Sequence, residues 1–378
     1  MSVENTFILY ISFFVISFLF MYQSYYYDQI GENIYITRGV SKSSLFTTLS
    51  FLTLLALIIF RNGVGTDYPR YQELFYSIHR NSLNSIEVEW LRGSILYWAI
   101  CKVITAVTLN PYIMFGVMGF ITLLFFYLGL CKSDNKKEAL YLFFCCCIYF
   151  QIFNQVRQMV AVSMVFYSFY YYKNGEIKKF IVLILCAMGF HLSAGTVLIL
   201  LFVRNVKIRF RSLINYLLIA AIGYSLLSLF INIFNFIPYI SNYSYLFNSS
   251  NAGTNINLIV RIVLLFACLI LHGRTIERDE NSDRLYNIVI ICTILQLFAT
   301  KFPIIGRVTT FFFVAYIYLI PEILGSIRTY FKNNALNRMT IQIAFIIAFF
   351  CYFLVYYFSP TGSGAISGNY ISYKFFWQ

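Results

Sequence analysis

Apolar residues occur in long blocks along this chain, separated by short polar and often basic stretches. Blocks such as Phe7 to Met21 and Ile341 to Phe358 approach the ~20 residues that a helix needs to cross the hydrocarbon of a bilayer. Strands of a membrane barrel alternate in polarity, and these blocks do not. The pattern predicts an all-α, polytopic transmembrane bundle of about ten spanning helices in a single domain, residues 1–378. The predicted spans are residues 7–22, 45–60, 111–131, 139–153, 157–172, 213–235, 258–272, 285–300, 307–325 and 340–358.

Composition supports this fold class. Of the 378 residues, 60% are hydrophobic and only 11% are charged, whereas a soluble domain carries roughly a quarter charged residues. The first block lacks a basic n-region and a small-residue cleavage site, so we expect a first span and not a signal peptide. The nine cysteines form no C-x-x-C pair with partner spacing, so we expect neither a zinc site nor a disulfide framework. The chain has no D-x-D pair and no nucleotide-binding loop, and we expect no metal and no cofactor.

The net charge of +13 reflects topology, because cytoplasmic loops of membrane proteins are rich in Lys and Arg. Placing the basic loops inside leaves the uncharged stretch Phe236 to Asn257 and both chain termini outside. No basic soluble domain is present to bind nucleic acid. The loops placed inside are residues 132–137, 173–179, 204–211, 274–284 and 328–338, together with Arg38 and Lys42.

Two apolar segments do not fit as ordinary spans. Gly93 to Leu109 follows a loop placed outside, and we expect a helix lying at the outer membrane surface. Phe180 to Val203 has basic loops on both sides but is too short for two crossings, which favours a re-entrant pair of half-helices that turns near His191. The alternative is one ordinary span followed by a basic outer loop.

The loop after the second span concentrates polar chemistry at the membrane edge. It contains Arg61, Asp67 and Arg70, two glycines that allow close backbone approach, and Tyr68 and Tyr71, which suit stacking on sugar faces. Arg binds phosphate in a bidentate geometry, and Asp can accept a proton. The alternative is a turn in which an Arg–Asp pair caps a helix.

Further candidates stand at the ends of later spans. Arg157 and Gln158 open a span beside two more amides, where a charge is costly unless it is paired or functional. A snorkelling Arg is the alternative. His191, with Ser193 beside it, has an ordinary pKa that suits proton transfer, although a lone His in an apolar run is usually structural.

Weaker candidates are Arg307 and Arg261, which lie near outer span ends and suit anion binding or interfacial anchoring. Tyr243 belongs to the uncharged outer stretch, where amides and aromatic rings suit a sugar, unless this is an ordinary polar turn region. Glu322 lies within a span near its inner side, and we expect it to pair with a nearby cation.

These motifs together resemble the EpsG family of Wzy-like membrane polysaccharide polymerases. The resemblance covers most of the chain and begins with R-N-G-V-G-T-D-Y-P-R-Y from Arg61 to Tyr71. It continues with R-Q-x-x-A from Arg157 to Ala161 and F-H-x-S from Phe190 to Ser193. Gly306-Arg307 and an aromatic, basic terminus from Tyr370 to Phe375 follow in the same order.

The resemblance implies a membrane glycosyltransferase that joins oligosaccharide repeat units carried on undecaprenyl diphosphate, at the outer side of a bacterial cytoplasmic (inner) membrane. The product would be an O-antigen, capsular or exopolysaccharide chain. Arg157 and Arg307, then Arg61 and Arg70, would stabilise the departing diphosphate, and Asp67 or His191 would accept the proton of the attacking hydroxyl. Apart from the lipid bilayer, the partners that this implies are the lipid-linked oligosaccharide and a chain-length regulator and flippase of the same pathway.

Two other functions compete with this interpretation. A flippase or other transporter of lipid-linked oligosaccharide would also use outer Arg residues, but such folds usually contain two similar halves, and the chain shows no internal repeat. A ligase-like membrane glycosyltransferase would differ only in its product, which is one transfer in place of a ladder of repeat lengths.

Overall fold

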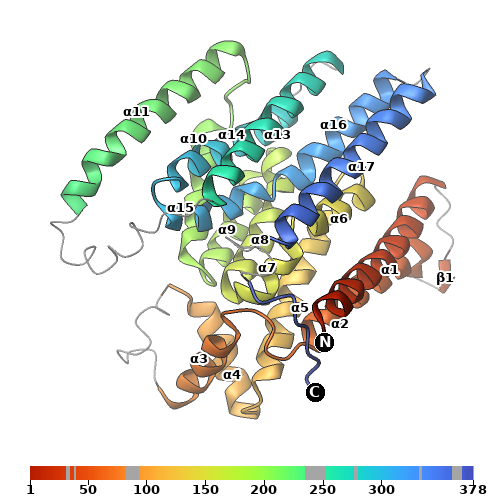
Figure 1. Cartoon of the computed structure of the whole chain (residues 1–378), viewed down its shortest axis with the longest axis vertical. Coiled ribbons are helices and arrows are strands. Elements are labelled where there is room, and N and C mark those ends of the chain that lie inside the picture. The colour runs from red at the N-terminus through yellow and green to blue at the C-terminus, as the bar shows by residue number, and fades with distance from the viewer. Residues whose placement is uncertain are drawn as a thin grey trace.

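The computed structural model describes residues 1–30, 35–37, 40–81, 93–234, 253–275, 280–331, 334–359 and 368–377, and nearly all of these residues are helical (Figure 1). The exception is a short antiparallel pair, β1 (Tyr35–Thr37) and β2 (Val40–Ser41). The first part of the chain forms α1 (Val3–Ile30), α2 (Lys42–Ile59), α3 (Tyr68–Arg80), α4 (Ile95–Val107), α5 (Pro111–Leu130), α6 (Lys136–Cys145), α7 (Ile148–Asn154) and α8 (Val156–Lys173). The remainder forms α9 (Ile177–Met188), the 3₁₀ helix η2 (Leu192–Ile199), α10 (Leu200–Val203), α11 (Phe210–Phe234), α13 (Gly253–Thr275), α14 (Glu280–Ala299), α15 (Pro303–Phe313), α16 (Tyr316–Tyr330) and α17 (Ala335–Tyr357).

Polar residues at the block edges set where several helices begin. Asn110 caps α5 by accepting a hydrogen bond from the Tyr112 N–H at 3.0 Å, and Pro111 occupies the first helical position, where its missing N–H costs nothing. Ser41 caps α2 in the same way, through the Ser44 N–H. Such caps satisfy helix-end donors that would otherwise be left unpaired.

Six segments are long and apolar enough to cross a membrane, which indicates a multi-pass membrane protein. They are Val3–Ile30, Lys42–Ile59, Pro111–Leu130, Glu280–Ala299, Ile304–Tyr330 and Ala335–Tyr357. These six correspond to six of the ten predicted spans. The expected count of about ten is therefore not confirmed.

The other four predicted spans are not among these six segments. Residues 139–153 are interrupted between α6 and α7, where Cys147 adopts a left-handed φ of 56°. Helix α8 has the length of a span but carries polar residues at both ends. Helices α11 and α13, with 25 and 23 residues, have the length of a span, and the apolar stretches within their described residues are Arg211–Leu226 and Asn257–Leu271.

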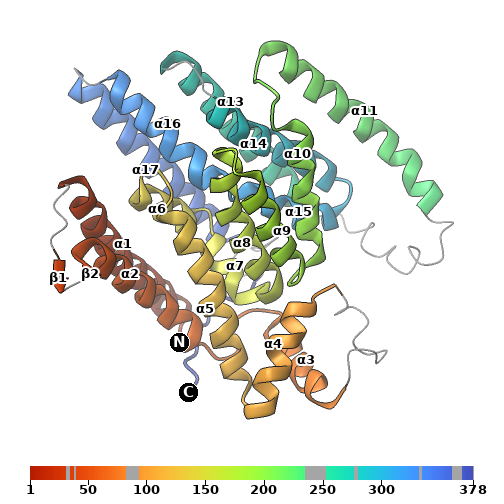
Figure 2. The ribbon, with the colours of Figure 1, turned by 180° about the vertical axis from the view of Figure 1, so that it is seen from behind.

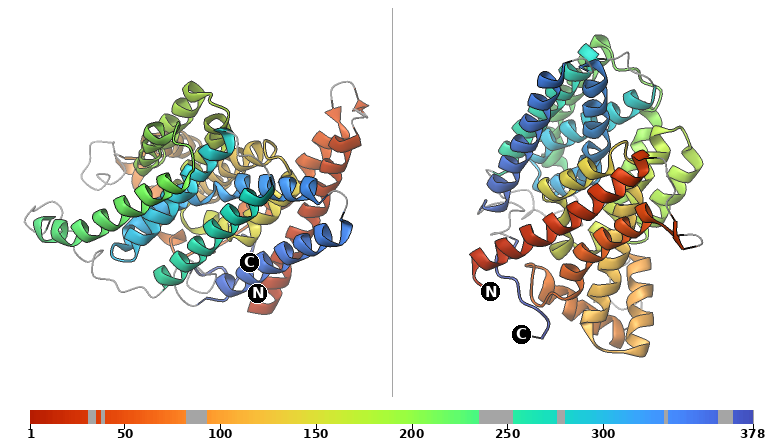
Figure 3. Two further views of the ribbon diagram at one scale, coloured as in Figure 1. Left: turned by 90° about the horizontal axis from the view of Figure 1, so that it is seen from above. Right: turned by 90° about the vertical axis from the view of Figure 1, so that its right-hand side faces the viewer.

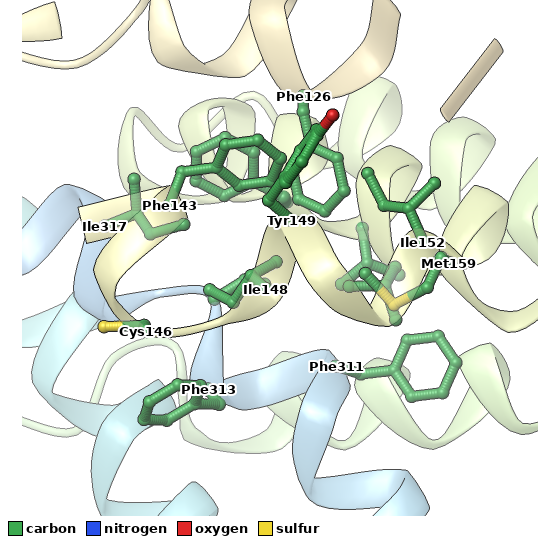
Figure 4. Packing of buried hydrophobic residues seen from close by; sticks show 14 of the residues in the cluster. Phe126, Phe143, Cys146, Ile148, Tyr149, Ile152, Met159, Phe311, Phe313 and Ile317 are labelled. Atoms are coloured by element: carbon green, nitrogen blue, oxygen red, sulfur yellow. The ribbon is translucent and has the colours of Figure 1, made fainter. Parts of the chain in front are cut away.

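The interrupted helix α6–α7 lies at the centre of the bundle. Figure 4 shows Phe126 and Phe143 on one side of α7, and Phe311 and Phe313 of α15 on the other. Tyr149 of α7 is fully buried, and its hydroxyl donates to the Leu54 carbonyl at 2.8 Å. Because so short a helix is stabilised mainly by tertiary packing, these contacts explain how α7 persists beside a break.

The structure confirms that the segment from Phe180 to Val203 turns near His191. Helix α9 ends at Met188, and η2 begins after His191. Tyr172 contacts both ends of the pair: its ring lies 5.1 Å from the Phe180 ring, and its hydroxyl donates to the Leu200 carbonyl at 2.9 Å. The segment therefore returns to the end of the bundle where it began, and it is not one ordinary span.

Loops predicted to share the inner side meet at one end of the bundle, here called the charged end. Lys173 pairs with Glu322 at 2.6 Å and with Asp134 at 3.7 Å, and its carbonyl accepts a hydrogen bond from Arg284. Arg328, on the same helix α16 as Glu322, pairs with Glu138 of α6. The expected pairing of Glu322 with a cation is thus confirmed.

The two chain ends lie side by side at the opposite end, as Figures 1 and 3 show. The amino group of Met1 donates to the Tyr373 carbonyl at 3.2 Å. Figure 2 shows α3 and α4 as a helical pair at this same end, beside the lower part of α5. Helix α4 confirms that the segment from Gly93 to Leu109 is helical, and Lys102 joins it to α3 by donating to the carbonyls of Ile78, His79 and Asn81.

Candidate functional site

The loop between α2 and α3 is held in place by the C-terminal segment 368–376, here called the strap. The Asn62 N–H donates to the Lys374 carbonyl at 2.8 Å, and the Phe376 N–H donates to the Phe60 carbonyl at 2.9 Å. Further along, the N–H groups of Gly65 and Thr66 donate to carbonyls of the strap. The loop and the strap therefore run antiparallel, and segments far apart in the sequence build one surface.

Arg61 is sealed beneath this surface, with 1% of its surface exposed. Its guanidinium carbon lies 5.1 Å from the centres of the Phe115 and Phe153 rings and 5.9 Å from that of Tyr68. Burial lowers the pKa of Arg61 to about 10, so the side chain stays charged at neutral pH. Aromatic faces and the strap enclose the cation, so this candidate for diphosphate binding is not exposed at the surface.

Asn154 ties the same loop to the start of α8. Its Oδ1 accepts a hydrogen bond from the Asp67 N–H at 2.7 Å and another from the Thr66 hydroxyl at 3.0 Å. Asp67 occupies the N-cap position of α3, and its half-buried side chain makes no cap hydrogen bond. Asn154 precedes Arg157 by three residues, so this contact fixes the backbone of Asp67, the predicted general base, near the start of α8.

Arg157 lies in the first turn of α8 and contacts two other helices. Its Nη1 donates to the Ser94 hydroxyl at 3.0 Å, and its guanidinium carbon lies 5.7 Å from the centre of the Tyr97 ring. The Arg157 N–H donates to the Tyr71 hydroxyl at 3.5 Å. The positive end of the α8 dipole adds to the favourable potential for an anion at this point.

His191 lies in the break between α9 and η2, outside the six candidate spans. Its Nδ1 and the Ser193 hydroxyl are 2.6 Å apart. The Leu192 N–H donates to the Gly93 carbonyl at 3.1 Å, which brings this break next to Ser94. Burial, followed by the charges of Arg157 and Arg307, lowers the pKa of His191 to about 4, so the imidazole is neutral at pH 7.

Arg307 approaches from α15 with an exposed side chain. Phe311 lies one turn further along the same face of α15, and its ring centre is 6.1 Å from that of His191. The carbonyl of Arg307 accepts a hydrogen bond from the Gln158 side chain at 2.8 Å. Three chain segments thus bring Arg157, His191 and Arg307 together.

The other predicted binding residues lie in different surroundings. Arg70 is exposed on α3, whereas Tyr68 is buried and stacked on Phe115 with ring centres 4.2 Å apart. Arg261 is buried on α13, where its Nη1 donates to the Cys292 sulfur at 3.0 Å and its guanidinium lies over the Phe313 ring. Arg261 therefore contacts protein groups and not the cluster around His191. Tyr243 lies outside the described residues.

No group of three or more His, Cys, Asp or Glu side chains in the described part of the chain is arranged to hold a metal ion. The chemistry available at the cluster is that of two cations beside a neutral imidazole and a hydroxyl. Cations fixed in this way stabilise an anion, and a neutral imidazole can accept a proton.

Comparison with protein families decides the class of protein. The model of the EpsG family matches residues 44–375, nearly the whole chain. The chain belongs to the EpsG family. Searches of curated proteins and of solved structures returned no significant match. The predicted family resemblance is therefore confirmed, and the membership and the apolar helices together indicate a membrane protein related to polysaccharide synthesis.

The sequence of this EpsG-family chain did not indicate the roles of two residues at the site, Ser94 and Asn154. Ser94 is buried, with 3% of its surface exposed, and contacts Arg157 across 63 positions of sequence. Asn154 was noticed as one amide among several, but its bond to Asp67 spans 87 positions. The only available signal was that a small polar residue follows Gly93 at the start of an apolar block.

Proposed function

We propose that the protein polymerises oligosaccharide repeat units carried on undecaprenyl diphosphate, at the outer side of the bacterial cytoplasmic membrane. The observation that supports this most is the convergence of Arg157, Arg307 and His191 in a chain of the EpsG family. The product would be an O-antigen, capsular or exopolysaccharide chain.

The two arginines suit the leaving group of this reaction. When the bond between the anomeric carbon and the diphosphate oxygen breaks, negative charge grows on the diphosphate. Arg157 and Arg307 are placed before the reaction to stabilise that charge, and Arg matches phosphate oxygens in a two-pronged geometry. Arg157 is already oriented by Ser94, so part of the ordering cost is met before substrate binds.

A proton must also leave the attacking hydroxyl. The hydroxyl oxygen forms the new bond to the anomeric carbon, the diphosphate departs with the electron pair of the old bond, and the proton passes to a base. His191 is neutral and adjacent to both arginines, and a bound diphosphate would offset their charges and make the imidazole more basic. Asp67 remains the second candidate, because its loop is fixed through Asn154 to the start of α8.

Complementation of a strain that lacks the protein tests this proposal, with surface polysaccharide separated on a gel. We expect the deletion to leave single repeat units, wild type to restore a ladder, and membrane-inserted Arg157→Ala, Arg307→Ala and His191→Ala not to restore it. Arg204→Ala is the matched control, because Arg204 is an exposed arginine beside Val203, whose carbonyl bonds Asn287 of α14. The control should give a normal ladder.

Other outcomes would favour the competing functions. If the deletion leaves no repeat units on the outer face, the defect lies in export and a transporter is indicated. If repeat units accumulate but wild type adds only one unit to an acceptor, the protein is a ligase-like transferase. A normal ladder from Arg157→Ala and Arg307→Ala together would remove the assignment of the diphosphate site.

A further inference from the structure

Gln158 follows Arg157 on α8, and its side chain bonds the backbone of α15. The residue is buried, with 4% of its surface exposed, and its Nε2 donates to the Arg307 carbonyl at 2.8 Å. A carbonyl oxygen has two lone pairs, so this bond can coexist with the helical bond of α15. Gln158 therefore ties α15 to α8 at the backbone of Arg307, whose charge acts on His191.

The opposite side of α15 is attached to α14. The Thr309 hydroxyl contacts the Gln296 side-chain oxygen at 3.3 Å, and the Cys292 thiol donates weakly to the Thr309 carbonyl at 3.7 Å. Thr309 is only two residues from Arg307, so the two attachments hold one turn of α15 between α8 and α14. A shift of that turn changes the position of Arg307 directly.

We infer that Gln158 is a positioning residue that sets the separation between the Arg157 and Arg307 guanidinium groups, an inference that rests on the proposed diphosphate-binding role of these arginines. Arg157 and Arg307 belong to different helices, so their spacing depends on how α8 meets α15. Gln158 fixes that contact one residue from Arg157 and at the backbone of Arg307. In this role Gln158 acts through the backbone of Arg307 and does not itself need to contact the substrate.

A site with two arginines on different helices needs a residue that fixes the distance between them. Two charges that bind one diphosphate must both lie within hydrogen-bonding distance of its oxygens, and a misplacement of about 1 Å can cost about 100-fold in rate. A buried amide serves this purpose well, because its hydrogen bond is directional and protected from water.

The first test measures geometry without relying on catalysis. The chain has three histidines, so the ring signals of ¹³C-labelled histidine are few, and His191→Asn assigns the signal of His191. We expect Gln158→Met, which keeps the volume and removes the donor, to raise the pKa of His191 by about half a unit as Arg307 moves away, because Arg307 is the smallest of the three causes that lower this pKa. Gln158→Glu, which places an acceptor against the Arg307 carbonyl, should shift it in the same direction.

Asn287→Leu provides the matched control. Asn287 is also a buried amide that bonds backbone carbonyls of another segment, those of Val203 and Val206, but it lies towards the charged end. We expect this variant to lower thermal stability and leave the pKa of His191 unchanged. If both Gln158 variants keep the wild-type pKa of His191 while remaining folded, Gln158 does not position Arg307 and the inference fails.

The second test uses inorganic pyrophosphate as the probe. We expect Gln158→Met and Arg307→Gln each to weaken its binding about tenfold, and the double variant to lose little more, since both changes remove one interaction. Additive losses would contradict the inference. If wild type does not bind pyrophosphate but the pKa of His191 still responds to Gln158→Met, then the positioning is correct and the proposed diphosphate site is wrong.

Discussion

The two glycines of the α2–α3 loop provide a matched pair of perturbations within three residues. Gly63 and Gly65 both have a positive φ, 65° and 106°. A Cβ at Gly63 would meet no atom within 4 Å, whereas a Cβ at Gly65 would lie 2.4 Å from the Phe153 carbonyl oxygen. The same substitution therefore tests backbone strain alone at Gly63, and strain together with a collision at Gly65.

The expected magnitudes differ accordingly. Gly63→Ala places an L-residue in the left-handed region and should cost about 1 kcal/mol of folding free energy. Gly65→Ala lies outside even that region and adds backbone strain of about 1–3 kcal/mol, before the overlap with Phe153 forces the loop or the end of α7 to move. Because Asn154 follows Phe153 and holds Asp67, that movement should also abolish polymer formation, whereas Gly63→Ala should retain it.

Buried thiols allow the stability measurement. Six of the nine cysteines are buried, so a thiol-reactive dye that labels them reports unfolding as the protein is heated; they are Cys101, Cys145, Cys146, Cys147, Cys268 and Cys292. We expect the apparent Tm of Gly65→Ala to fall clearly further than that of Gly63→Ala. If the two variants have the same Tm and both make polymer, the close approach of the loop to α7 does not hold in the membrane, and the derived position of Asp67 is wrong.

Three further predictions follow from single contacts. In folded protein, an arginine-directed dicarbonyl reagent should modify exposed Arg307 well before sealed Arg61, as peptide mass spectrometry would show; equal modification would contradict the enclosure of Arg61. Lys102→Met should cost about 2 kcal/mol, since three carbonyls at the end of α3 lose a charged donor, and hydrogen exchange there should quicken while Lys102→Arg keeps most of the protection. The polymerisation rate should fall as acid protonates His191. In a pH profile, the acid decline of kcat/KM should lie near the pKa of free-enzyme His191, about 4, and the acid decline of kcat should lie at higher pH, because bound diphosphate offsets the charges of the two arginines. If both declines occur at the same pH, His191 is not the base.

Local patterns in the sequence predicted the parts of the fold that depend on local physics. Basic residues on both sides of Phe180 to Val203 predicted a turn near His191, because cations at both ends of a short apolar run disfavour a crossing. The structure has that turn. The break between α6 and α7 left no comparable signal, because Cys147 sits in a continuous apolar run and only long-range packing reveals its left-handed backbone.

Side-chain partners at the site depended on long-range contacts and were predicted less well. The types of residue were chosen for their chemistry, and Arg157, His191 and Arg307 do converge. Gln158, however, is a candidate for substrate binding in the sequence because amides cluster around Arg157, whereas in the structure its side chain bonds a backbone carbonyl 149 positions away. No local pattern distinguishes an amide that meets a ligand from one that fixes a neighbouring helix.

The arginines show how burial separates roles that the sequence leaves alike. Arg61, Arg157 and Arg307 all stand near span ends in the sequence, but their exposure increases in that order from enclosed to open. An arginine that binds an incoming anion needs donors that can reach it, so the enclosed Arg61 is the least suited to that task. Its charge is held by three ring faces under the strap. Backbone hydrogen bonds join that C-terminal segment to the loop that carries Asp67. Since that loop is fixed in turn by Asn154, the end of the chain contributes to the site by keeping α3 against the start of α8.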